Sequence, residues 1–125
     1  MVASVLFLTY DGLLDPLGGS QILPYIFSIS EHPRQVYVLS FEKPKRLAKS
    51  EGELRFQLRQ QGIEWKPLLF TTSFGRLGKL WDLTRLYCWA AWLSYKKKVQ
   101  IVHARGHPTA QVGLAVKRLF GVRLI

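Results

Sequence analysis

The stretch VLFLTYDGLLDPLGGSQ, residues 5–21, decides the fold that we expect. It begins with an apolar run, continues through a polar loop and closes with Gly18, Gly19 and Ser20, after which a helical pattern begins. A strand, a glycine-rich turn and a helix start are the parts with which α/β domains direct backbone N–H groups at a phosphate. The same glycine pair also suits a simple tight turn into a helix capped by Ser20, so both interpretations stay open at this point.

Strand-like and helix-like segments alternate along the rest of the chain. The predicted strands are residues 4–9, 35–41, 63–70, 99–104 and 122–125. The predicted helices are residues 20–32, 51–61, 79–98 and 106–121, and residues 42–49 read as a basic, proline-containing loop. This alternation predicts an α/β fold, a Rossmann-like parallel sheet with right-handed crossovers and helices on both faces.

Length, charge and cysteine content restrict the possible classes. The 125 residues suffice for one small domain with a single core, and we expect residues 1–125 to form it. The formal net charge of +10 favours an anionic partner, such as nucleic acid, an acidic membrane surface or a phosphorylated substrate. The apolar neighbours of the single cysteine, Cys88, predict a buried and inert thiol. Without a signal peptide or an apolar run of roughly 18 to 20 residues, we expect a cytoplasmic protein.

Three segments carry a resemblance to a known family. They are VLFLTYDGLLDPLGGSQILPY (residues 5–25), VLSFEKP (residues 38–44) and IVHARGHPTAQVGLAVKRLFGVRLI (residues 101–125). The chain resembles the N-terminal half of retaining glycosyltransferases of the large family 4 group, which includes glycogen and sucrose-phosphate synthases. The resemblance implies a GT-B architecture, in which two Rossmann-like domains face each other across a cleft. The sequence stops inside the predicted fifth strand, so we expect a longer polypeptide with a C-terminal donor-binding domain.

The resemblance also implies roles for residues at the carboxyl edge of the sheet. Gly18 and Gly19 would close on the diphosphate of a nucleotide-sugar, which is a co-substrate and no cofactor, and Ser20 would open the helix aimed at it. The candidate catalytic residue is His103. The family often carries His-x-His at this point, whereas this chain has His103-Ala104-Arg105. The candidates for acceptor binding are Asp11, Asp15, Arg105 and His107.

Each of these residues has a structural interpretation as well. His103 suits a core histidine bonded to a loop, and Arg105 suits a solvated loop arginine or a bidentate contact to an anion. Asp11 and Asp15 suit turns, and His107 suits helix capping or exposure. The three histidines do not form a metal-ligand spacing with nearby carboxylates, so we expect no metal.

The predicted helix 79–98 carries three of the four tryptophans and ends in three lysines. Residues 86–93 are apolar all round and must be covered on more than one side. Either a neighbouring segment buries this helix, or one flank lies in a membrane interface. The membrane-surface candidates are Trp89, Trp92, Lys96, Lys97 and Lys98. The resemblance agrees with the second option, because many of these enzymes glycosylate lipid-linked acceptors at the cytoplasmic leaflet.

The leading hypothesis is therefore the acceptor-side domain of a nucleotide-sugar-dependent glycosyltransferase. It would transfer a hexose, with retention, to a glycan or a lipid-linked acceptor, and the 125 residues alone should be inactive without a donor-binding half. One alternative is a stand-alone basic α/β module for nucleic acid or an anionic surface, although no nucleic-acid motif accompanies the charge. Another is a non-functional remnant of a truncated gene.

Overall fold

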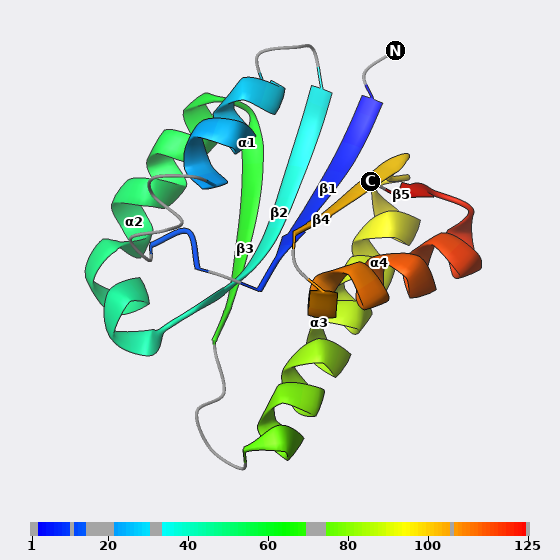
Figure 1. The fold of residues 1–125 in the computed structure, drawn as a ribbon. Coiled ribbons are helices and arrows are strands. Elements are labelled where there is room, and N and C mark those ends of the chain that lie inside the picture. Colours follow the sequence, from blue (N-terminus) through cyan, green and yellow to red (C-terminus); the bar gives the residue numbers. More distant parts are fainter. Residues whose placement is uncertain are drawn as a thin grey trace.

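The five described strands form one parallel sheet (Figure 1). The computed structural model describes residues 3–10, 12–14, 22–30, 34–69, 75–105 and 107–124. The strands are β1 (Ala3–Thr9), β2 (Arg34–Glu42), β3 (Ile63–Leu69), β4 (Ile101–Arg105) and β5 (Arg123–Leu124), in the order β3-β2-β1-β4-β5. The order reverses at β1, so β1 and β4 are neighbours whose carboxyl ends open on the crevice where such sheets bind ligands. The predicted α/β, Rossmann-like fold is confirmed.

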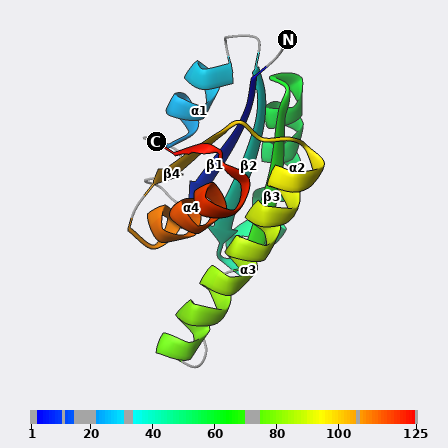
Figure 2. The same ribbon diagram turned by 90° about the vertical axis from the view of Figure 1, so that its right-hand side faces the viewer.

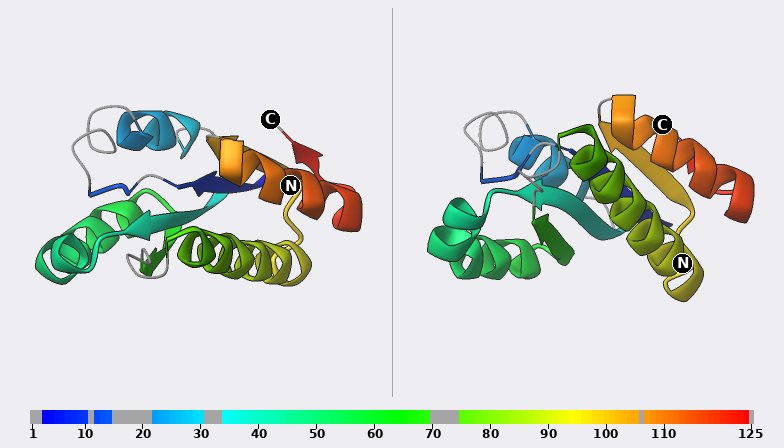
Figure 3. Two further views of the ribbon diagram at one scale, coloured as in Figure 1. Left: turned by 60° about the horizontal axis from the view of Figure 1, so that its bottom comes forward. Right: turned by 90° about the horizontal axis from the view of Figure 1, so that it is seen from below.

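Two helices cover each face of the sheet. They are α1 (Leu23–Ser30), α2 (Pro44–Gln60), α3 (Arg76–Lys96) and α4 (His107–Phe120). Seen from the carboxyl edge, α1 and α3 lie on opposite sides of the strands (Figure 3). The strand order determines which face each helix covers. Right-handed crossovers to β2 and β3 move across the sheet in one direction, and those to β4 and β5 move in the opposite direction, so their helices lie on opposite faces.

Side chains along the buried strands point alternately to the two faces of the sheet and form an apolar core on each face. Phe7, Val36 and Val38 pack with Ile26 of α1 and with Leu54 and Leu58 of α2. The opposite core contains neighbouring strand residues together with α3 and α4: Leu6, Leu8, Leu39, Leu86, Ala90, Val112 and Val116. Strands with both faces covered read as nearly continuous apolar runs, which is why β1 and β2 were recognisable in the sequence.

The prediction of a loop over residues 42–49 is wrong, because α2 begins at Pro44. Proline has its ring φ preset for a helix and lacks the N–H that the first turn leaves unpaired, so it is well suited to a helix start. The residues that follow Pro44 include good helix formers, and the helix continues without a break to Gln60. Gly62 then takes a φ of 75°, the left-handed conformation that ends helices.

The outer edge of β3 is chemically closed to further strand pairing. The Trp65 carbonyl accepts a hydrogen bond from Arg55 at 3.1 Å, and the Leu69 carbonyl accepts one from Arg85 at 2.5 Å. Successive residues alternate in direction, so Pro67 faces the same edge, and it has no N–H to offer. Arginine caps and a proline are ways in which natural sheets discourage edge-to-edge aggregation.

The helix α3 is longer than the sheet is tall, and its first turns extend past the carboxyl ends of the strands (Figure 2). The prediction of a buried Cys88 is wrong, since this residue is exposed on α3. Its side chain faces away from the buried positions Leu86, Ala90 and Leu93. The apolar segment 86–93 is therefore covered on its sheet side and is open at Cys88 and Trp92 within the described part of the molecule.

Candidate functional site at the carboxyl edge

Four strand ends meet at the carboxyl edge of the sheet, on the face that α1 partly covers. Thr9 is in register with Ser40 on one side and with Arg105 on the other. One row further into the sheet, Phe7 is in register with His103. The fold therefore brings together polar residues from β1, β2 and β4, which is the position at which parallel α/β sheets bind ligands.

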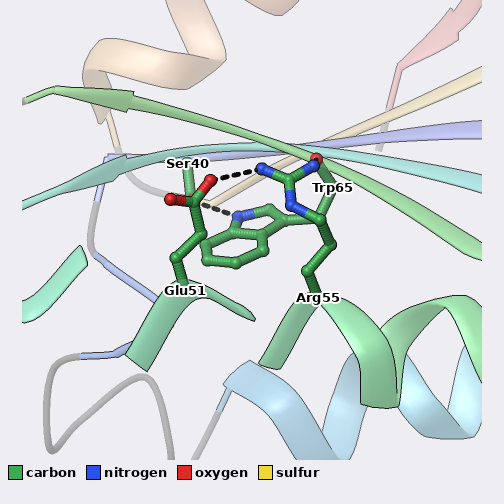
Figure 4. A network of polar contacts seen from close by, with 4 residues as sticks. All are labelled: Ser40, Glu51, Arg55 and Trp65. Carbon is green, nitrogen blue, oxygen red and sulfur yellow. Dashed lines mark hydrogen bonds and ion pairs between the residues drawn. The ribbon is translucent and has the colours of Figure 1, made fainter. Parts of the chain in front are cut away.

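A buried polar network organises the β2 end of this edge. The fully buried carboxylate of Glu42 accepts hydrogen bonds from the backbone N–H groups of Leu13 (2.8 Å) and Leu14 (3.1 Å). It also accepts one from the Ser40 hydroxyl at 2.5 Å. The Trp65 indole N–H donates to that hydroxyl at 2.8 Å (Figure 4). Glu42 thus ties residues 13 and 14, which follow β1, to the end of β2.

The same tryptophan is held from its other side by α2. Arg55 donates to the Trp65 carbonyl and pairs with Glu51 at 2.6 Å (Figure 4). Its guanidinium carbon also lies 5.6 Å from the centre of the indole ring. These contacts fix the ring whose N–H orients Ser40, and through Ser40 they support the Glu42 carboxylate.

His103 lies in an aromatic setting at the edge of the α1 core. Its imidazole stacks on the Phe7 ring with centroids 4.9 Å apart and an interplanar angle of 15°. The Tyr25 hydroxyl of α1 lies 3.4 Å from Nδ1, at the long end of the hydrogen-bond range. The side chain is half-buried, and no described residue hydrogen-bonds to Nε2. His103 is therefore a packed histidine with one ring nitrogen toward α1.

This setting favours the neutral imidazole. Burial lowers the pKa of His103 below its ordinary value of 6.5, and the nearby positive charge of Arg105 lowers it further. When the Tyr25 hydroxyl donates to Nδ1, the single ring proton is on Nε2. The group can then offer an N–H donor to a bound hydroxyl or oxyanion near neutral pH, and it can gain a proton only at lower pH.

Arg105 ends β4 and is held by the start of α4. Its carbonyl accepts a hydrogen bond of 2.5 Å from the buried Thr109 hydroxyl. One turn later in α4, a Cβ at Gly113 would lie 2.7 Å from the Leu124 Cδ1 of β5, the end of a flexible side chain, and in ordinary contact at 3.6 Å from the Ala104 Cβ of β4. The half-buried guanidinium of Arg105 is two residues from His103 along β4, so a ligand at this edge meets a fixed positive charge beside a neutral imidazole.

The first turns of α3 form a second rim of the same edge. The Lys79 ammonium lies 5.9 Å from the Tyr10 ring centre, and Tyr10 packs against Phe41. Burial raises the pKa of Tyr10, and the carboxylate of Asp82 raises it further. Asp82 is itself fully buried and pairs with Arg85 at 2.5 Å. Tyr10 thus remains a neutral phenol here at physiological pH.

The structure describes only some of the predicted site residues. Asp11, Asp15, Gly18, Gly19 and Ser20 lie outside the described residues, and so does the side chain of His107, whose backbone begins α4. His103 and Arg105 lie together at the carboxyl edge, as expected from the strand pattern. Tyr25, Glu42 and Ser40 are added by the structure. Their partners lie 78, 29 and 25 residues away in sequence, so no local pattern could reveal them.

Within the described residues, no group of three or more His, Cys, Asp and Glu side chains could hold a metal ion. A groove of about 700 Å³ lies away from the carboxyl edge, along the amino half of β3. Its lining includes Tyr37, Lys66, Trp89, Trp92 and Lys97. The groove lacks the convergence of strand ends that defines the candidate site.

Comparison with known proteins places the fold among glycosyltransferases. No protein-family model and no curated protein sequence matches the chain. The fold is similar to that of a glycosyltransferase from Rickettsia africae ESF-5, with a TM-score of 0.61 and 11% identity over 98% of this chain and 28% of that one. It is also similar to Acinetobacter baumannii MurG, with a TM-score of 0.59 and 17% identity over 98% of this chain and 34% of that one. The chain thus spans about a third or less of these proteins, and the likeness shows a glycosyltransferase-like fold.

Proposed function

We propose that this chain is the acceptor-side domain of a nucleotide-sugar-dependent, retaining GT-B glycosyltransferase of the family 4 group. It would hold a glycan or lipid-linked acceptor while a donor-binding domain supplies the hexose. The observation that carries the proposal is the pair His103 and Arg105 at the carboxyl edge, in a fold shared with glycosyltransferases. The role of Gly18, Gly19 and Ser20 at the donor diphosphate remains part of this proposal.

The chemistry of the pair suits an acceptor site. A neutral His103 with its proton on Nε2 would orient an acceptor hydroxyl by donating a hydrogen bond to its oxygen. That oxygen would bond to the anomeric carbon of the donor while the bond to the nucleoside diphosphate breaks, and the departing diphosphate would take the hydroxyl proton. Arg105 would bind an anionic group with its planar fork of donors, a geometry that lysine lacks. Asp11, Asp15 and His107 are further candidates for contacts to acceptor hydroxyls. Tyr25 is a positioning residue, because it acts on the ligand only through the His103 ring.

Binding is the direct test, because residues 1–125 span about a third or less of the glycosyltransferases whose fold they share. We suggest ¹H–¹⁵N NMR titrations of residues 1–125 with a panel of glycosides and with a short-chain, water-soluble lipid-linked sugar. The amides of Thr9, His103 and Arg105 should shift with an acceptor, and Arg105→Lys should weaken the binding. The matched control is Arg118→Lys on the exposed side of α4, which should bind like the wild type.

A second titration separates the leading function from its rival. If a DNA duplex shifts amides across several basic surfaces, with an affinity that falls steeply with salt, the chain is a basic binding module. Acceptor-induced shifts confined to the carboxyl edge would support the transferase domain. In a transferase that contains this chain, His103→Ala should reduce turnover by roughly 100-fold, the scale on which a misplaced reacting group slows a reaction.

A further inference from the structure

The exposed face of α3 carries an apolar stripe that no other part of the described chain covers. We define the α3 stripe as Leu77, Leu80, Trp81, Cys88, Trp92 and Tyr95. With 3.6 residues per turn these positions fall within about a third of the helix circumference. The buried positions of the helix, including Leu86, Ala90 and Leu93, occupy the other side. The helix therefore carries apolar residues on two opposite sides, one toward the core and one toward solvent.

The exposed fractions of these large apolar side chains are unusual for a solvated helix. Leu77 is 70% exposed, Trp81 58%, Trp92 48% and Tyr95 72%. Several large apolar side chains exposed on one helix face, interrupted here by Thr84, indicate an interaction site. Trp89 does not belong to the stripe, because it is half-buried and lies beneath the Lys66 ammonium at 4.6 Å.

The charges around the stripe indicate what covers it. Asp82, the only carboxylate in α3, is fully buried. Arg76 and Lys79 flank the first turns, and Lys96, Lys97 and Lys98 follow the last, all of them exposed. The helix therefore presents apolar and cationic groups to solvent but no exposed anionic side chain. Leucine, tryptophan and tyrosine flanked by lysines is the pattern of helices that lie in the interface of an anionic bilayer.

We propose that the α3 stripe binds the surface of an anionic lipid bilayer, with the helix axis lying along the membrane plane. The exposed tryptophans and leucines would enter the headgroup region, and Arg76, Lys96, Lys97 and Lys98 would meet lipid phosphates, whereas Lys79 faces Tyr10. No helix of the described chain is long and apolar enough to cross a bilayer. This proposal does not depend on the transferase function, since a binding test with lipid alone decides it.

Vesicle co-sedimentation of the 125-residue chain tests the proposal. We expect binding to vesicles of phosphatidylcholine with phosphatidylglycerol, weakened by salt, and little binding to phosphatidylcholine alone. Replacing Lys96, Lys97 and Lys98 with glutamine should reduce partitioning by about 100-fold, because each lysine near such a surface contributes a factor of about five. The matched control replaces Lys45, Lys49 and Arg59, which are exposed on α2, and should bind like the wild type.

A second set of variants tests the contribution of the apolar side chains to vesicle binding. Leu77→Ser with Trp81→Ser should abolish most of the binding, whereas Phe56→Ser, at a position 63% exposed on α2, should not change it. Brominated lipids should quench the tryptophan fluorescence of the wild type. Quenching should disappear when Trp81 and Trp92 are replaced with phenylalanine, although this variant still binds.

Three results would overturn the proposal: equal binding to both vesicle types, binding to neither, or unchanged binding in the lysine variant. Sedimentation velocity without lipid adds a fourth, because a dimer that Trp81→Ser disrupts would make a second copy of this chain the partner of the stripe. If the double serine variant does not fold, the lysine variant and the brominated-lipid measurement still decide the question.

Discussion

Replacing Glu42 with glutamine tests the buried network on which the carboxyl edge depends. The change keeps the size and shape of the side chain but replaces one carboxylate oxygen with an amide NH₂. Glu42 accepts from the backbone of Leu13 at 2.8 Å, from that of Leu14 at 3.1 Å and from Ser40 at 2.5 Å. Glutamine offers only one acceptor oxygen, so at least one of these donors faces an NH₂ group instead of an oxygen.

The cost follows from the loss of these bonds in a fully buried place. A hydrogen bond to a charged group contributes about 1.5–3 kcal/mol, and a buried donor left without an acceptor costs about 1–3 kcal/mol. Glutamine retains part of the network, so we expect Glu42→Gln to lower the free energy of unfolding by about 2–4 kcal/mol. This is a large share of the total stability of about 5–15 kcal/mol that small domains have.

Urea denaturation and amide hydrogen exchange together measure the effect. The unfolding midpoint should fall, and the Leu13 and Leu14 amides should exchange faster than those of the strand centres. Glu53→Gln, on the exposed face of α2, is the matched control and should stay within about 0.5 kcal/mol of the wild type. A Glu42→Gln variant with wild-type stability and unchanged exchange at both leucines would refute the role assigned to the carboxylate.

Three further predictions concern packing, pH and the sheet edge. Gly113→Ala should change stability by less than about 1 kcal/mol in urea denaturation, because the added methyl meets only the mobile end of Leu124 and alanine favours helix; Gly113→Ile should cost about 2–3 kcal/mol. The lowered pKa of His103 means that the unfolded chain binds more protons just below pH 6.5, so stability should fall as the pH drops from 6.5 to the folded pKa, and His103→Gln should remove this component. Arg55→Ala with Pro67→Val should increase self-association in sedimentation velocity, because the outer edge of β3 becomes open to pairing.

The parallel sheet and its alternation with helices followed from local sequence patterns, whereas the strand order came from the structure. Buried parallel strands such as β1 and β2 are short apolar runs between turn residues, and the alternation with helices leaves few possible topologies. The start of α2 was missed because lysine and proline in residues 42–49 look like a loop. Proline is favourable in the first turn of a helix and unfavourable further in. Whether a proline indicates a helix start or a helix break therefore depends on where the helix begins, which the sequence alone does not give.

The candidate site was predictable only where a strand end defines it. His103 and Arg105 end β4, and a parallel sheet places such residues at the carboxyl edge whatever surrounds them. Glu42 carried no such signal, since an acidic residue before a basic stretch is usually solvated. Its carboxylate accepts hydrogen bonds from the backbone of Leu13 and Leu14, which lie 29 and 28 residues away in sequence. The contact between Tyr25 and His103 likewise depends on the packing of α1 on β1 and β4.

The geometry of α3 connects the proposed site with the proposed membrane surface. The first turns of this helix extend past the carboxyl ends of the strands (Figure 2). The Lys79 ammonium lies 5.9 Å from the Tyr10 ring centre at the rim of the site. A bilayer that covers Leu77 and Trp81 would therefore lie beside the carboxyl edge and not at the opposite end of the sheet. A lipid-linked acceptor could then approach the carboxyl edge from the α3 side, and its sugar would have to extend across the strand ends to reach His103 on the α1 side. Binding of the short-chain lipid-linked sugar at the carboxyl edge, together with vesicle binding through α3, would select the lipid-linked class; acceptor binding without vesicle binding would select soluble glycans.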